Sequence, residues 1–190
     1  PRGPKGLGVS DLPVRLGIRP AGSDALIARA AAGGIRRIGD RLVSGGAVEA
    51  ARHAMLEAIA AFHREHPLEP GMPLELVRRA VGSDVLAQQA LAALREEQEI
   101  AVELGTARLV AHRPSIPAAL ASAGEIIRGE LAQSGHEGRT PGELSGKVAE
   151  PQALQLLEYF VREGTALRVG RDRYYARARL EELIRKLLGE

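Results

Sequence analysis

Arginine side chains beside tyrosine are the residues of this chain whose chemistry is most specific. The larger cluster lies near the C-terminus, next to Tyr174 or Tyr175, and comprises Arg168, Arg171, Arg173, Arg177 and Arg179. A smaller cluster comprises Arg36, Arg37 and Arg41. Guanidinium groups bind phosphate oxygens and aromatic rings stack on bases, so both clusters, with Tyr174, are candidate RNA contacts. The alternative is a solvated surface, because arginine is the main cation here, with 23 Arg and three Lys.

Other chemistry finds little support in the sequence. The absence of cysteine excludes disulfides, zinc ribbons and thiol catalysis. There is no nucleophile motif and no phosphate-binding loop of the Walker type. His63 and His66 lie three residues apart with no third ligand evident, so we interpret them as histidines that complement a helix C-terminus. We therefore expect no catalytic residue, no metal and no cofactor in this chain.

The arginines lie on two of three similar ribbons, each a pair of short strands joined at a glycine. The ribbons span residues 35–43, 100–110 and 167–175, and their glycines, Gly39, Gly105 and Gly170, lie 66 and 65 positions apart. A spacing of this size indicates one small module used repeatedly. Helical segments precede each ribbon, and a helix pair followed by a β-ribbon is the plan of a winged helix.

The helix signals support this plan. Long leading helices are expected at 47–66 and 116–134, and Thr140-Pro-Gly-Glu143 has the pattern of a capping box. The second helix of each pair would be the recognition helix, at 23–32, 84–96 and 151–163. A closing amphipathic helix is expected at 180–188. We predict a mostly α fold with short β-ribbons (α+β), as tandem winged-helix modules at 1–45, 46–113 and 114–190.

Charge distinguishes the modules from one another. The net charge is only +2, but residues 1–50 hold 8 basic and 4 acidic groups, residues 51–104 hold 5 and 9, and residues 162–190 hold 8 and 5. A polyanion would therefore meet the two ends before the middle. The recognition helices carry few of the Arg, Lys, Asn or Gln side chains that read bases, which argues against sequence-specific DNA binding.

One stretch carries a family resemblance. Residues 62–78 read Phe-His-Arg-Glu-His-Pro-Leu-Glu-Pro-Gly-Met-Pro-Leu-Glu-Leu-Val-Arg, and they resemble the segment between the first two helices of a winged helix in bacterial selenocysteine-specific translation elongation factors. The flanking residues 8–43 and 168–183 resemble the preceding and following modules. The resemblance covers nearly the whole chain, and residues 62–78 are its most specific part.

The resemblance implies a non-catalytic extension of a translational GTPase. Such factors carry selenocysteinyl-tRNA, GTP and Mg²⁺ on N-terminal domains, and their last winged helix grips an mRNA hairpin on the ribosome. This chain would be the first three modules, which space the body from the hairpin-binding module with accessory RNA contact. It lacks the basic recognition segment of the last module. We expect residues upstream of Pro1 to complete the first module, which lacks a leading helix.

Two other interpretations remain open: a winged-helix DNA-binding regulator, and a protein-interaction module, which the acidic middle favours. We expect a monomer without membrane contact, because no run of residues approaches the ~18 apolar residues of a membrane span. No signal peptide is visible, and the lack of cysteine fits a reducing compartment, so we expect a cytoplasmic location.

Overall fold

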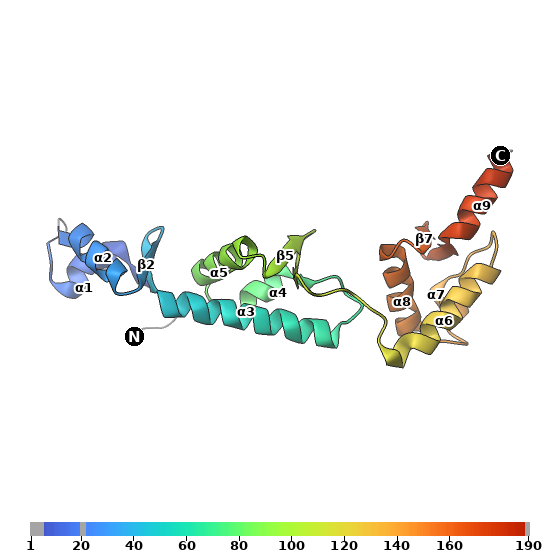
Figure 1. Ribbon diagram of the computed structural model, residues 1–190, viewed down its shortest axis with the longest axis horizontal. Helices are drawn as coiled ribbons and strands as arrows, with labels where there is room; N and C mark the ends of the chain where they lie inside the picture. Colours follow the sequence, from blue (N-terminus) through green and yellow to red (C-terminus); the bar gives the residue numbers. More distant parts are fainter. Residues whose placement is uncertain (1–5, 20–21, 189–190) are drawn as a thin grey trace. The chain divides into compact units, whose positions relative to one another are not determined.

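The computed structural model describes residues 6–19 and 22–188, in which a helix-and-hairpin unit occurs three times (Figure 1). Repeat 1 (residues 6–44) contains β1 (Leu7–Gly8), the 3-10 helix η1 (Val9–Asp11), α1 (Leu12–Leu16), α2 (Ser23–Ala32), β2 (Ile35–Ile38) and β3 (Arg41–Ser44). Repeat 2 (residues 45–113) contains α3 (Gly45–Glu65), β4 (Met72–Pro73), α4 (Leu74–Arg79), α5 (Asp84–Glu96), β5 (Ile100–Glu103) and β6 (Thr106–Leu109). Repeat 3 (residues 114–188) contains α6 (Ala118–Gln133), α7 (Pro141–Leu144), α8 (Glu150–Arg162), β7 (Ala166–Val169) and β8 (Arg173–Ala176), and it is followed by α9 (Arg177–Leu188). The predicted fold class, mostly helical with small antiparallel hairpins that are consistent with tandem winged helices, is confirmed.

Each hairpin is joined by a third, very short strand. The strand orders are β1-β3-β2 and β4-β6-β5, and in repeat 3 an isolated bridge from Arg139 to Tyr174 takes the same place beside β8. A glycine precedes the short strand in each repeat: a Cβ atom on Gly6, Gly71 or Gly138 would lie only 2.7–2.8 Å from a carbonyl oxygen of the middle strand. These glycines let the backbone of the short strand lie close to that of the middle strand. The regular spacing of Gly39, Gly105 and Gly170 did not predict this role for Gly6, Gly71 and Gly138.

The three ribbon glycines do not occupy the same position in their hairpin turns, although their spacing in the sequence is nearly constant. In repeat 1 the turn is Gly39-Asp40, between the paired residues Ile38 and Arg41. In repeat 2 it is Leu104-Gly105, so the residue that corresponds to Gly39 is Leu104. In repeat 3 the turn has three residues, 170–172. The period therefore identifies the strands correctly but misaligns the turns by one residue.

Helix α3 supplies the centre of the core of repeat 2. Met55 and Ile59, one helical turn apart, are fully buried against α4 and α5, where Val77 and Leu94 are also fully buried. The N-terminal part of α3 packs beside Val43 of β3, so the core of repeat 2 continues into the ribbon of repeat 1.

Repeat 1 has apolar residues at positions equivalent to those of the repeat 2 core. Its described residues include no long leading helix equivalent to α3. An apolar cavity of about 270 Å³ lies there. Three of its lining residues lie 65 positions before buried core residues of repeat 2: Leu12, Ile35 and Leu42 correspond to Val77, Ile100 and Ala107. That upstream residues complete this module stays a prediction.

His63 is part of the packing at the end of α3. It is buried, its Nε2 accepts a hydrogen bond from the Leu109 backbone N–H (3.3 Å), and its ring stacks on His112 with 3.5 Å between centroids. Burial, followed by the nearby His112 and Arg108, lowers the pKa of His63 to about 4. His63 is therefore a neutral core histidine, and the interpretation that it complements the C-terminus of the helix was wrong.

The chain divides into two compact units, Pro1–Glu65 with Pro70–Arg113, and His66–Glu69 with Pro114–Glu190. The four residues 66–69 belong to the second unit because Leu68 is only 5% exposed in the core of repeat 3. Arg162 donates a hydrogen bond to the Leu68 carbonyl (2.6 Å) and pairs with Glu69 (3.8 Å). The division into three domains stays a proposal.

We predict that Leu68→Ala destabilises the second unit by about 2–4 kcal/mol, because it empties a buried site. All three tyrosines, Tyr159, Tyr174 and Tyr175, lie in this unit, so urea unfolding followed by tyrosine fluorescence reports on it. Leu154→Ala, at an exposed site on α8, is the control and should change little. An unchanged midpoint for Leu68→Ala would contradict the assignment of residues 66–69 to this core.

We predict that Gln98→Gly stabilises the first unit by about 0.5–1 kcal/mol. Gln98 ends α5 with φ 58°, where α2 and α8 have Gly34 (φ 80°) and Gly164 (φ 76°). All three backbone N–H groups donate to the carbonyl three residues earlier. Far-UV circular dichroism should show a higher Tm with the tyrosine-reported transition unmoved; a lower Tm would show that the Gln98 side chain matters.

Candidate nucleic-acid interface

The third ribbon does not present its arginines on one face. In the pairing of β7 with β8, Arg168 lies opposite Tyr174, and Val169 lies opposite Arg173. Residues opposite each other share a face and successive residues alternate. Arg168 and Tyr174 therefore lie on one face of the ribbon, and Arg173 and Tyr175 lie on the other.

Tyr174 and Arg168 hold the ribbon against α8. Tyr174 is fully buried, and its hydroxyl donates a hydrogen bond to Glu158 of α8. The Arg168 guanidinium pairs with the same carboxylate (3.0 Å) and lies 5.8 Å from the centre of the tyrosine ring. Burial, together with the hydrogen bond to Glu158, raises the pKa of Tyr174 to about 12. The Tyr174 ring has no free face for a base in this structure.

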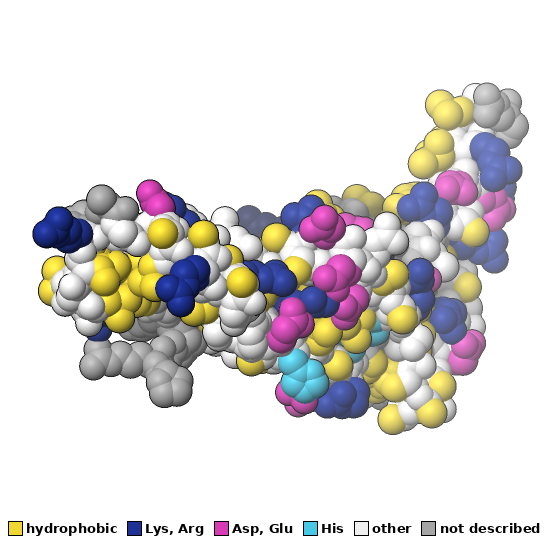
Figure 2. Space-filling model, turned by 60° about the vertical axis from the view of Figure 1, so that its left-hand side comes forward, with side chains coloured by type: hydrophobic (Ala, Val, Ile, Leu, Met, Phe, Trp, Pro, Cys, Tyr) yellow, Lys and Arg dark blue, Asp and Glu magenta, His cyan; other side chains and the backbone are white. Residues whose placement is uncertain are grey.

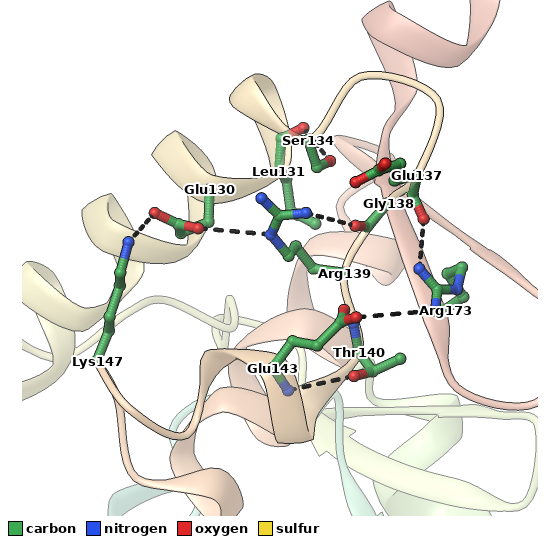
Figure 3. Close-up of polar contacts among 10 residues, drawn as sticks. All are labelled: Glu130, Leu131, Ser134, Glu137, Gly138, Arg139, Thr140, Glu143, Lys147 and Arg173. Carbon is green, nitrogen blue, oxygen red and sulfur yellow. Dashed lines mark hydrogen bonds and ion pairs between the residues drawn. The ribbon is translucent and has the colours of Figure 1, made fainter.

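Arg173 joins the ribbon to the start of α7 (Figure 3). Its Nη1 donates to the Glu137 carbonyl (2.6 Å), and its Nη2 lies 3.8 Å from Glu143. Glu143 also accepts from the Thr140 N–H (2.8 Å), and its own N–H donates to the Thr140 hydroxyl (3.2 Å), which confirms the predicted capping box. The Thr140 hydrogen bond is the main cause that lowers the pKa of Glu143.

A second polar group in Figure 3 connects α6 to the same region. Glu130 pairs with Lys147 and with Arg139 (3.5 Å), and the hydrogen bond from Lys147 is the main cause that lowers its pKa. The sequence contains no signal for this group, because on a helix pattern Glu130 is simply a polar residue of the outer face. The group stabilises the corner between α6 and α7.

The remaining arginines of the large cluster differ in availability. Arg177 pairs with Glu181 (3.9 Å), and Arg179 pairs with Glu182 (2.9 Å). Arg171 is exposed in the turn, and no residue in the described part of the chain pairs with its guanidinium. It is the cation of this ribbon best placed to meet a ligand.

The first ribbon shows the same separation. Arg36 and Arg37 are successive residues of β2 and lie on opposite faces. Arg37 donates to the Gly39 carbonyl (3.1 Å), and Arg41 is half-buried with a polar partner of its own. Arg36 is exposed, and within residues 6–19 and 22–188 its side chain has no partner.

The wider surface carries no single basic patch on the face drawn in Figure 2, where basic side chains are scattered among acidic ones. On α8 the solvent-facing residues include Glu150, Gln152 and Gln155, and on α5 they include Asp84 and Gln88. Each of these helices carries one arginine, Arg95 or Arg162, in its last turn, so their surfaces offer few cations to a phosphate backbone. The described residues contain no group of three potential metal ligands and no helix long and apolar enough to cross a membrane.

Comparison with known proteins identifies the middle of the chain. Residues 56–109 match the family model described as elongation factor SelB, winged helix. The matched segment runs from within α3 to the end of β6 and includes the 62–78 stretch that carries the resemblance. No curated protein matches the chain. The segment 56–109 is therefore a winged helix of the SelB type, in keeping with a role in selenocysteine incorporation.

We predict that Arg171→Ala and Arg168→Ala affect different properties: the first lowers RNA affinity and the second lowers stability. Arg171→Ala should weaken RNA binding at low salt with little change in stability, because its guanidinium pairs with no described residue. Arg168→Ala should lower the urea midpoint, since it leaves the Glu158–Tyr174 pair without its cation. Filter binding of a short RNA and tyrosine fluorescence measure the two effects; equal loss of RNA binding without loss of stability in both variants would contradict this division.

Proposed function

We propose that this chain is a non-catalytic row of winged helices in a selenocysteine-specific elongation factor. In this role it spaces the body that carries selenocysteinyl-tRNA, GTP and Mg²⁺ from the module that binds the mRNA hairpin on the ribosome, in the cytoplasm. The observation that carries the proposal is the SelB winged-helix match over residues 56–109, flanked by similar helix-and-hairpin units on both sides.

The continuity of the chain favours a spacing role. Helix α3 begins at Gly45, directly after β3 ends at Ser44, and its 21 residues extend over about 30 Å. Val43 packs in the same core as Val48 and Met55 of α3. A hairpin packed on the helix that follows it is a stiffer connection than an open linker.

Helix α9 supports a further module after the third. It follows β8 directly, as α3 follows β3. Its leucines lie 132 positions after buried α3 residues: Leu180, Leu183 and Leu187 correspond to Val48, Ala51 and Met55. Leu187 is 86% exposed, and the core of a following winged helix would cover it.

The accessory RNA contact rests on few residues. Among the proposed contacts, Arg171 and Arg36 are exposed and pair with no described side chain, whereas Arg168, Arg173 and Tyr174 hold the third ribbon in place. The scarcity of cations on the recognition helices disfavours a DNA-binding regulator. We therefore propose weak, salt-sensitive RNA contact at the ribbon turns.

The experiment compares this chain with a longer one that includes the hairpin-binding module. A selenocysteine insertion hairpin is titrated with each at 150 mM salt, and a random genomic DNA fragment is the control ligand. We expect tight hairpin binding only by the longer protein, and no DNA retention by either. Equal hairpin affinity of the two proteins would show that this chain is itself the hairpin reader and not a spacer.

A further inference from the structure

His63 ties the C-terminal end of α3 to the second ribbon. β6 is the middle strand of its sheet, and β4, which pairs with residues 106 and 107, does not extend as far as Leu109. The Val110 N–H donates across the ribbon to the Glu99 carbonyl (3.0 Å), so the N–H of the preceding Leu109 points to the opposite side, beyond β4. There His63 Nε2 accepts its hydrogen bond (3.3 Å) in place of a strand carbonyl.

This hydrogen bond defines the state of the imidazole. Because Nε2 is the acceptor, the ring proton of neutral His63 is on Nδ1. Nδ1 is buried, and no atom in the part of the chain that the structure describes accepts a hydrogen bond from it. The ring is held by Leu109, by its stack on His112, with 3.5 Å between centroids, and by an edge contact with Phe62.

A proton on Nε2 is incompatible with this arrangement. It would turn the acceptor into a donor that faces the Leu109 N–H, and it would place a charge in a buried position. The titratable or charged groups that act on His63 are His112, in the segment after β6, and Arg108 of β6, and both disfavour a cation there. Burial is the largest cause, and the three together lower the pKa of His63 to about 4.

The same contact holds the segment that follows β6. Residues 110–113 are the last residues of the first unit. The His112 N–H donates to the Leu109 carbonyl (2.9 Å), and Arg113 donates to the Val110 carbonyl (2.8 Å), so this segment forms a turn. The His112 ring packs this turn against His63, and therefore against the end of α3.

We propose that His63 is an acid-sensitive latch, which ties residues 109–113 to the end of α3 while it is neutral and releases them when it takes up a proton. This inference goes beyond the spacing role and does not depend on it. In the open state the imidazole has its ordinary pKa of 6.5, so the closed state has its full stability above that pH. The equilibrium shifts toward the open state by up to about tenfold per pH unit as the pH falls from 6.5 to about 4.

Amide hydrogen exchange at single residues tests the latch. We expect the protection factor of the Leu109 N–H to fall about twentyfold between pH 7 and pH 5. The Val110 N–H, which donates to a backbone carbonyl, is the internal reference and should keep its protection. His63→Gln supplies an amide oxygen that accepts without titrating, so the protection of Leu109 should then not depend on pH. His53→Gln, at an exposed histidine of α3, is the matched control and should behave as the wild type does.

Nitrogen-15 chemical shifts of the imidazole rings are a second measurement, which needs no variant. His63 should be the Nδ1–H tautomer at pH 7. The Nε2–H tautomer, or titration of His63 at its ordinary pKa of 6.5, would overturn the proposal. So would a Leu109 protection factor that does not change with pH, or one that falls together with that of Val110, because the first unit would then open as a whole. The spacing role is decided separately by the hairpin comparison.

Discussion

The direct continuation of a hairpin into the next helix is the constraint on which this structure depends. Units of about 65 residues bury a small core, so each gains from packing against a neighbour. Where β3 runs into α3 without an intervening residue, the helix carries apolar side chains from one ribbon into the next core, and repeats 1 and 2 form one compact unit. Where residues 110–117 separate β6 from α6, the chain divides into two units.

Most of the charge in repeat 3 is used within the repeat. Arg168 and Tyr174 share Glu158, Arg173 reaches Glu137 and Glu143, and Glu130 accepts from Lys147 and Arg139. Exposed ion pairs contribute little individually. Together these contacts link one face of the ribbon to α8 and the other face to α7. Although the segment is rich in arginine, few of its cations remain available to a ligand. In the turn of the ribbon, Arg171 is one that does.

The proposed function follows from this distribution. A protein that reads bases would expose several cations on its recognition helices, whereas α5 and α8 expose one arginine each, Arg95 and Arg162, in their last turns. Within the first unit, the packing of β3 on α3 joins hairpin to helix, which is in keeping with the proposed spacing role. In the proposed function, RNA contact is made at the turns of the first and third ribbons, where Arg36 and Arg171 are exposed.

The sequence by itself determined the repeat, the helices, the ribbons and the SelB-type segment, because periodic apolar residues, glycines and the 62–78 stretch are local signals. It did not determine which residue lay at each turn, since Gly39 corresponds to Leu104 and only strand pairing shows this. Only the tertiary structure decided that Tyr174 is buried, that His63 is a neutral core residue, and that Leu68 belongs to the core of repeat 3. Each of these outcomes depends on partners distant in sequence: Tyr174 on Glu158, His63 on Leu109 and His112, and Leu68 on Arg162, which is 94 residues away. Burial and pairing at such separations are properties of the packed chain, which no local pattern encodes.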